Sequence, residues 1–164
     1  MENFKVISQP SLELQANILY NDGYNKKALF ITDGSDPKLT KTTITFVTHN
    51  DNKDHDTQLN VRIKTKVNLF LSKDLAVGSN LGGDMEFVDP STHSFDLVLV
   101  SDNIHLSDLS LPIVDIDIQP NGNDRWIFDF QVALTFDDGN TYSSKSQGLI
   151  LDQDNKHYEG VFSS

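Results

Sequence analysis

Clusters of aspartate in two polar segments are the first residues of this sequence with the chemistry to bind a ligand. The clustered residues are Asp51, Asp54, Asp56, Asp152 and Asp154. Calcium takes six to eight oxygen ligands, so neighbouring loop carboxylates are what such a site requires. The second cluster fails as an EF-hand loop, because His157 stands where that loop needs glycine. Asp and Asn also stabilise turns by hydrogen-bonding their own backbone. We therefore interpret both clusters as turns and predict no metal site and no cofactor.

The histidines and serines show no catalytic spacing. The five histidines are His49, His55, His93, His105 and His157. Only His49 and His55 lie close together, and no H-x-x-x-H or HExxH spacing occurs. The G-x-S-x-G motif of serine hydrolases is absent, and Gly82-Gly83 is not followed by the G-K-[ST] of a phosphate loop. We predict that the protein is not an enzyme. A metal-dependent hydrolase built on residues 49–56 is the weakest alternative.

Three basic residues at alternate positions form a basic stripe, which consists of Arg62, Lys64 and Lys66. If residues 58–70 form a strand, these side chains share one face, because side chains alternate between the two faces of a strand. On a chain with a net charge of −11, this stripe is the candidate binding site for an acidic partner. The alternative is a solvated sheet face whose cations pair with acids on neighbouring strands, such as Asp115, Asp117 or Asp129.

The elements that position these residues are strands, because apolar side chains recur at every second position. The clearest series is Trp126, Phe128, Phe130, Val132, Leu134 and Phe136. Mostly small or polar residues lie between them, so one face of this strand is expected in the core and the other toward water. A helix would scatter the same residues around its circumference.

Residues 112–151 predict a three-stranded antiparallel meander. The turn at 120–124 contains Asn-Gly, and the turn at 137–140 contains Asp-Gly. These pairs favour hairpins because they adopt positive φ at low cost.

Shorter alternating or β-branched runs predict further strands. They lie near residues 12–20, 28–32, 42–48, 58–70, 95–99 and 158–162. Residues 73–83 are interpreted as a long connection, and residues 50–56 as a mobile loop. The whole pattern gives roughly nine or ten strands and no convincing helix. We therefore predict an all-β fold, an antiparallel two-sheet β-sandwich formed by a single domain over residues 1–164.

Composition limits the classes of function. The 164-residue chain has 24 acidic and 13 basic residues and no cysteine. Its net charge opposes general nucleic-acid binding. The absence of cysteine excludes disulfides and favours a reducing compartment. Because we find neither a signal peptide nor a long apolar run, we expect a soluble protein that is cytoplasmic, or exported without a cleaved signal peptide.

Two classes of function remain. The first is a non-enzymatic binding or interaction module whose loops hold a protein or a glycan. A lectin-like version would use the tyrosines near turns, namely Tyr20, Tyr24, Tyr142 and Tyr158. The second is a water-soluble, toxin-like protein that oligomerises on membranes through its amphipathic strands, although the net charge opposes anionic membranes. A homo-oligomer is compatible with both.

Overall fold

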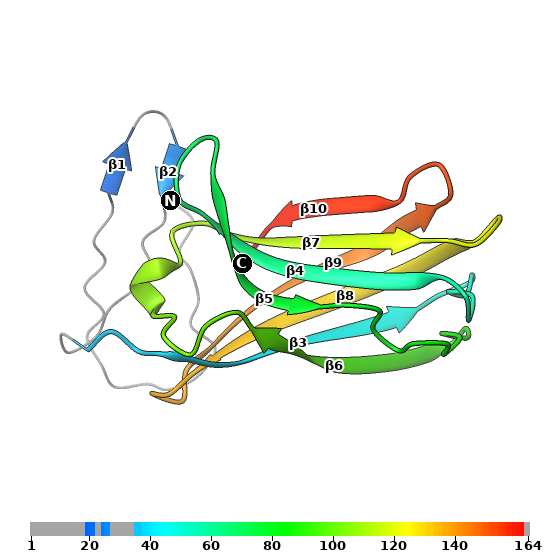
Figure 1. Ribbon diagram of the computed structural model, residues 1–164, viewed down its shortest axis with the longest axis horizontal. Coiled ribbons are helices and arrows are strands. Elements are labelled where there is room, and N and C mark those ends of the chain that lie inside the picture. The colour runs from blue at the N-terminus through cyan, green and yellow to red at the C-terminus, as the bar shows by residue number, and fades with distance from the viewer. Residues whose placement is uncertain (1–18, 22–23, 27–34, 163–164) are drawn as a thin grey trace.

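The computed structural model describes residues 19–21, 24–26 and 35–162 of the chain (Figure 1). Within them the structure is all-β, as predicted. The elements are β1 (Leu19–Asn21), β2 (Tyr24–Lys26), β3 (Leu39–Thr48), β4 (Gln58–Lys66), β5 (Ser72–Gly78), β6 (Ser91–Leu99), the 3-10 helix η1 (Leu106–Asp108), β7 (Pro112–Gln119), β8 (Arg125–Phe136), β9 (Thr141–Asp152) and β10 (His157–Val161). Among these residues no helix has the length and apolar character needed to cross a bilayer. The strand predicted at 28–32, and most of the one at 12–20, lie outside the described residues.

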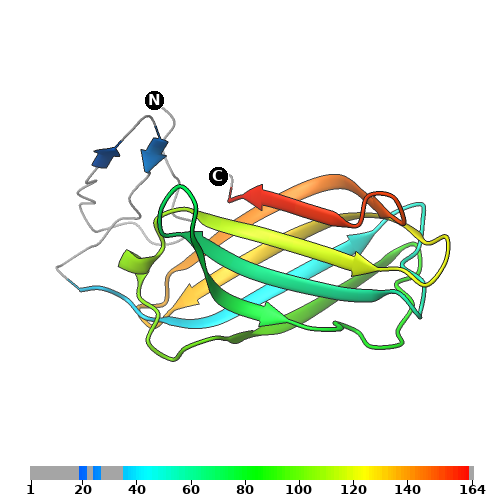
Figure 2. The ribbon, with the colours of Figure 1, turned by 45° about the horizontal axis from the view of Figure 1, so that its top comes forward.

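The main sheet is antiparallel and has the strand order β10-β7-β4-β5-β6-β3-β8-β9. It curls around a shared core until it is nearly closed like a barrel (Figure 2). The curl brings the ring of Phe130 on β8 to within 5.6 Å of the Tyr158 ring on β10, measured between centroids. The predicted division into two separate sheets is not confirmed, because the register pairs Ala76–Leu99 and Val77–Val98 join β5 to β6.

Strand β8 has the alternation that its sequence predicts. Its inward residues are Trp126, Phe128, Phe130, Val132, Leu134 and Phe136, and all are buried. Trp126 stacks on Phe128 with ring centroids 3.8 Å apart. The indole N–H of Trp126 donates to Oγ1 of the buried Thr48 at 3.0 Å. This bond satisfies the one polar group of the tryptophan, which allows the whole ring system to be buried.

The predicted three-stranded meander is only half correct. Strands β8 and β9 form the predicted hairpin across the Asp-Gly turn. Strand β7 does not pair with β8, because β7 lies between β4 and β10 and β8 lies between β3 and β9. The connection at 120–124 crosses instead to the other half of the curled sheet. Alternation shows which side chains of a strand are buried, but both arrangements bury the same side chains, so the pattern does not identify the neighbouring strand.

The hairpin formed by β4 and β5 also differs from the prediction. Strand β4 ends at Lys66, and Val67, expected inside it, is 48% exposed. Strand β5 occupies part of the predicted connection. Its adjacent residues Leu75 and Ala76 are both buried, which breaks the alternation that would have indicated a strand. A register shift in the pairing with β4 accompanies this irregularity.

Candidate functional site

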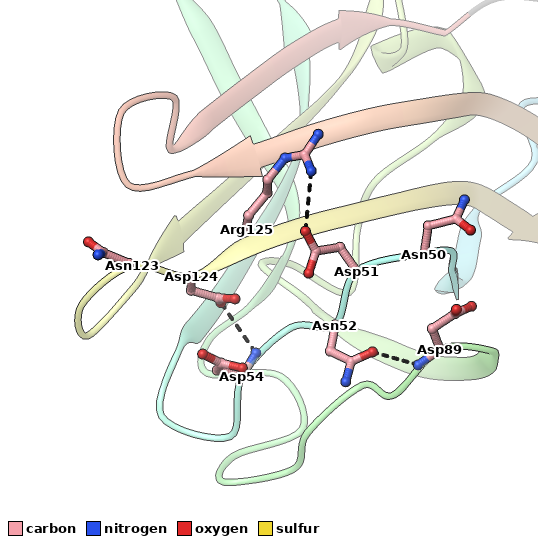
Figure 3. A pocket seen from close by; sticks show the side chains of 8 residues that line it. All are labelled: Asn50, Asp51, Asn52, Asp54, Asp89, Asn123, Asp124 and Arg125. Carbon is pink, nitrogen blue, oxygen red and sulfur yellow. Dashed lines mark hydrogen bonds and ion pairs between the residues drawn. The ribbon is translucent and has the colours of Figure 1, made fainter.

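Three loops at one end of the sheet surround an open pocket with a volume of about 480 Å³ (Figure 3). They connect β3 to β4, β5 to β6 and β7 to β8, and Figure 1 shows them together at the right. The pocket is lined by Asn50, Asp51, Asn52, Asp54, Asp89, Asn123, Asp124 and Arg125. Every lining residue is therefore an aspartate, an asparagine or an arginine. We call this site the loop-end pocket.

Lys53 anchors the β3–β4 loop against the β5–β6 loop. Its side chain is fully buried, although it lies in the middle of a polar segment. The ammonium donates to the carbonyl oxygens of Asp54 at 2.9 Å and Thr57 at 2.8 Å, and it lies 4.8 Å from the centroid of the Phe87 ring. The backbones of Lys53 and Phe87 also exchange two hydrogen bonds. The segment predicted to be a mobile loop is therefore tied down at its centre.

Further hydrogen bonds join the three loops. The amide side chain of Asn52 accepts the backbone N–H of Asp89 at 2.7 Å and donates to a carboxylate oxygen of Glu86 at 2.9 Å. The carboxylate of Asp124, only 4% exposed, accepts the backbone N–H of Asp54 at 3.3 Å. These contacts hold the walls of the pocket in place before any ligand arrives, which reduces the entropy lost on binding.

The loop-end pocket carries excess negative charge. Its acids are Asp51, Asp54, Asp89 and Asp124, and its base is Arg125. The Arg125 guanidinium lies 3.4 Å from the Asp51 carboxylate. Burial, and then the negative charge of Asp124, raises the pKa of Asp54. Because four of the lining residues are acids and one is a base, a cationic group that enters the pocket would be stabilised.

The basic stripe lies on the outer face of β4, opposite the buried side chains of that strand. The ammonium of Lys64 contacts the buried carboxylate of Asp115 on β7 and donates to Glu159 on β10 at 2.9 Å. Arg62 lies 3.4 Å from Asp115. Two of the three cations therefore have acidic partners within the sheet. Binding of an acidic partner by the stripe stays a prediction.

Asp115, His157 and Glu159 are the one group in the described part of the chain with metal-ligand types close together. One ligand atom of each lies within 4.8 Å of the others. The ammonium of Lys64 already contacts both carboxylates, so it supplies the positive charge that a metal ion would bring. We interpret the group as an ion-pair network. No sequence pattern reveals it, because Asp115 joins the other two only through the pairing of β7 with β10.

The other aspartate and histidine candidates from the sequence do not assemble into a site within the described residues, and the side chains of Tyr20 and Tyr24 lie outside the described part of the chain. The carboxylate of Asp152 accepts the backbone N–H groups of Asp154 and Asn155 at 2.9 and 2.8 Å, which is the turn role expected for it. His49 lies 2.9 Å from Asp129 on β8, and this contact takes its ring to the sheet rather than to the pocket.

Half of the residues that line the loop-end pocket were not among the candidate site residues predicted from the sequence. They are Asp89, Asn123, Asp124 and Arg125. They come from loops far apart in the chain, and only the strand order brings those loops to one end of the sheet. The available signal was the local richness of each loop in Asp and Asn, a composition that ordinary turns share.

No family model, curated protein or solved structure matches this chain. The chemistry of the loop-end pocket is therefore the basis for a functional proposal.

Proposed function

We propose that the protein is a non-enzymatic binding module that holds a cationic side chain of a protein partner in the loop-end pocket. The observation that carries the proposal is the excess of carboxylates in a pocket whose walls are hydrogen-bonded in place. Arg125 lies beside Asp51. The buried Lys53 ammonium interacts with Asp124 and Asp54. Burial, followed by the charge of Asp124, still disfavours the ionised form of Asp54. A lysine or arginine side chain would relieve that repulsion and satisfy the carboxylate oxygens.

A basic protein segment fits this pocket better than a glycan does. Sugar recognition usually adds an aromatic ring that stacks on the pyranose face, and none of the lining residues is aromatic. The net charge of −11 attracts basic partners over longer distances and raises their rate of association. A toxin-like protein that oligomerises on membranes remains the alternative, and release of dye from liposomes distinguishes it.

The test is a titration with a fluorescein-labelled oligolysine peptide, followed by fluorescence anisotropy at low and physiological salt. We expect Asp54→Asn and Asp89→Asn each to weaken binding about three- to fivefold, the effect of one exposed ion pair. Physiological salt should weaken binding further, because it screens exposed charges.

The matched control is Asp102→Asn, which removes an exposed charge from the β6–β7 connection at the other end of the sheet. An equal loss of affinity in this control would mean that only the net charge matters, and the pocket would be rejected as the site. Binding to a glycan array without binding to the peptide would identify a glycan ligand instead.

A further inference from the structure

The turn between β4 and β5 exposes a continuous set of apolar side chains. We call this set the apolar tip, and it consists of Val67, Leu69, Phe70 and Leu71, which are 48%, 57%, 92% and 54% exposed. Isolated exposed apolar residues are ordinary, but a contiguous apolar surface usually marks a contact site. Val67, Leu69 and Phe70 lie within the strand predicted over residues 58–70, so their exposure becomes visible only in the structure.

The apolar tip has a defined conformation. The side-chain oxygen of Asn68 accepts the backbone N–H groups of Phe70 and Leu71, both at 2.9 Å. The backbone N–H of Val67 donates to the carbonyl of Leu71 at 2.9 Å and closes the turn. These bonds fix the backbone of the turn so that Phe70 points into solvent. Because the apolar tip is already ordered, it would lose little conformational entropy on making a contact.

Basic residues flank the apolar tip on both sides. Lys66, the last residue of the basic stripe, precedes it, and the exposed Lys73 follows it. Bonds to the segment before β7 hold the base of the hairpin: the N–H of Lys66 donates to the carbonyl of Leu111 at 3.2 Å, and the Ser110 hydroxyl donates to the carbonyl of Lys66. The hairpin thus presents apolar side chains with cations at their base.

The acids of the loop-end pocket lie far from this hairpin. The apolar tip and the loop-end pocket lie at opposite ends of the sheet (Figure 1). The nine residues of β4 separate them, a distance of roughly 30 Å at 3.3 Å per residue. Exposed charges are screened over about 8 Å at physiological ionic strength. The acids of the loop-end pocket therefore do not cancel the local positive potential of Lys66 and Lys73. The acids near these lysines are Asp74, which follows Lys73, and Glu159, which interacts with Lys66.

We propose that the apolar tip docks into the interfacial region of an anionic lipid bilayer. Phe70 and its apolar neighbours would enter the boundary between head groups and acyl chains, and Lys66 and Lys73 would extend toward lipid phosphates. A second copy of this chain fits less well, because a tip-to-tip contact would bring the lysines of both copies together.

The test is co-sedimentation of the full chain with vesicles of phosphatidylcholine, with and without phosphatidylserine. We expect binding to the anionic vesicles only, with a loss of about tenfold for Phe70→Ala, as removal of one buried aromatic side chain predicts. The matched control, Val98→Ala, removes an apolar side chain that is 69% exposed on β6, and it should bind as the wild type does.

Two further variants examine each part of the contact. Replacing Lys73 with Gln should weaken binding about fivefold, whereas the control Lys145→Gln, an exposed position on β9, should leave it unchanged. A Phe70→Trp variant should show a blue-shifted emission with anionic vesicles, since the native Trp126 is already buried. Absence of wild-type binding, equal binding of Phe70→Ala, or equal binding to neutral vesicles would overturn the proposal.

Discussion

At the scale of single residues, Asp54 is a carboxylate whose ionised form the folded structure disfavours. Its folded-state pKa lies above the unfolded value because of burial and the neighbouring Asp124 carboxylate. A raised carboxyl pKa contributes stability only below the unfolded pKa of about 3.9, and that contribution is lost as the pH rises through the folded pKa. At neutral pH the ionised Asp54 therefore opposes folding slightly.

We predict that Asp54→Asn stabilises the protein at pH 7, because it removes both the partial desolvation of the carboxylate and its repulsion by Asp124. The gain should be only about 0.5 kcal/mol, because most of the Asp54 side chain is exposed and solvent screens both effects. The gain should disappear near pH 3, where the carboxyl is neutral in both states. Urea unfolding at the two pH values measures it. Asp54→Asn should gain stability while it loses affinity for the peptide, as is typical of a residue retained for binding rather than for stability. If the variant exceeds the wild type by the same free energy of unfolding at pH 7 and pH 3, the charge of Asp54 does not destabilise the fold.

Lys64 carries a different residue-scale prediction, because the buried carboxylate of Asp115 depends on it. Burial lowers the pKa of Lys64, but the hydrogen bonds that its ammonium donates to Asp115 and Glu159 outweigh this effect and raise the pKa overall, so the ammonium stays charged. Lys64→Met should cost about 3 kcal/mol of unfolding free energy, as loss of one partner from a buried pair does. Lys66→Met, farther along the same stripe, should cost less than about 1 kcal/mol. Equal thermal melts of both variants would contradict the network.

At the scale of elements, β8 shows what a regular pattern predicts. Phe128 is fully buried between Trp126 and Phe46, with ring centroids 3.8 and 5.7 Å away. Phe128→Ala should therefore cost about 3–5 kcal/mol. Ile150→Ala on β9, where the side chain is 41% exposed, should cost about 1 kcal/mol or less. Chemical denaturation of the two variants checks the difference, and a near-neutral Phe128→Ala would reverse the assignment of faces.

The strands also show which features of the fold the sequence patterns do not predict. Alternation predicted the buried face of β8, and the Asp-Gly turn predicted its hairpin to β9. Both predictions rest on local geometry. It missed β5, where Leu75 and Ala76 are buried side by side, and it paired β7 with the wrong neighbour. The loop-end pocket shares this limit: Asp54 and Asp124 are 70 residues apart, and only the strand order brings them together.

At the scale of the whole molecule, the pairing between strands is uneven. Nine register pairs join β3 to β8, whereas β5 and β6 share only two. Amide exchange follows the local cost of opening, so the amides that cross between β5 and β6 should exchange faster than those between β3 and β8. Residue-resolved NMR measures this, and uniform protection across both ladders would show that the sheet opens as one unit.

The incomplete closure of the sheet also bears on how copies of the chain would aggregate. In the eight-stranded sheet, β9 and β10 are the two outer strands. Because these edges differ, pairing β9 of one molecule with β10 of the next would be head-to-tail, and such a contact propagates into a fibre when its rotation does not close into a ring. Strand β10 has only five residues, among them His157 and Glu159, and the ladder between β8 and β9 contains a register shift. Short length, charge and irregularity make an edge strand a poor template for pairing with another molecule. These features of β9 and β10 therefore disfavour fibre formation, although the sheet is not closed.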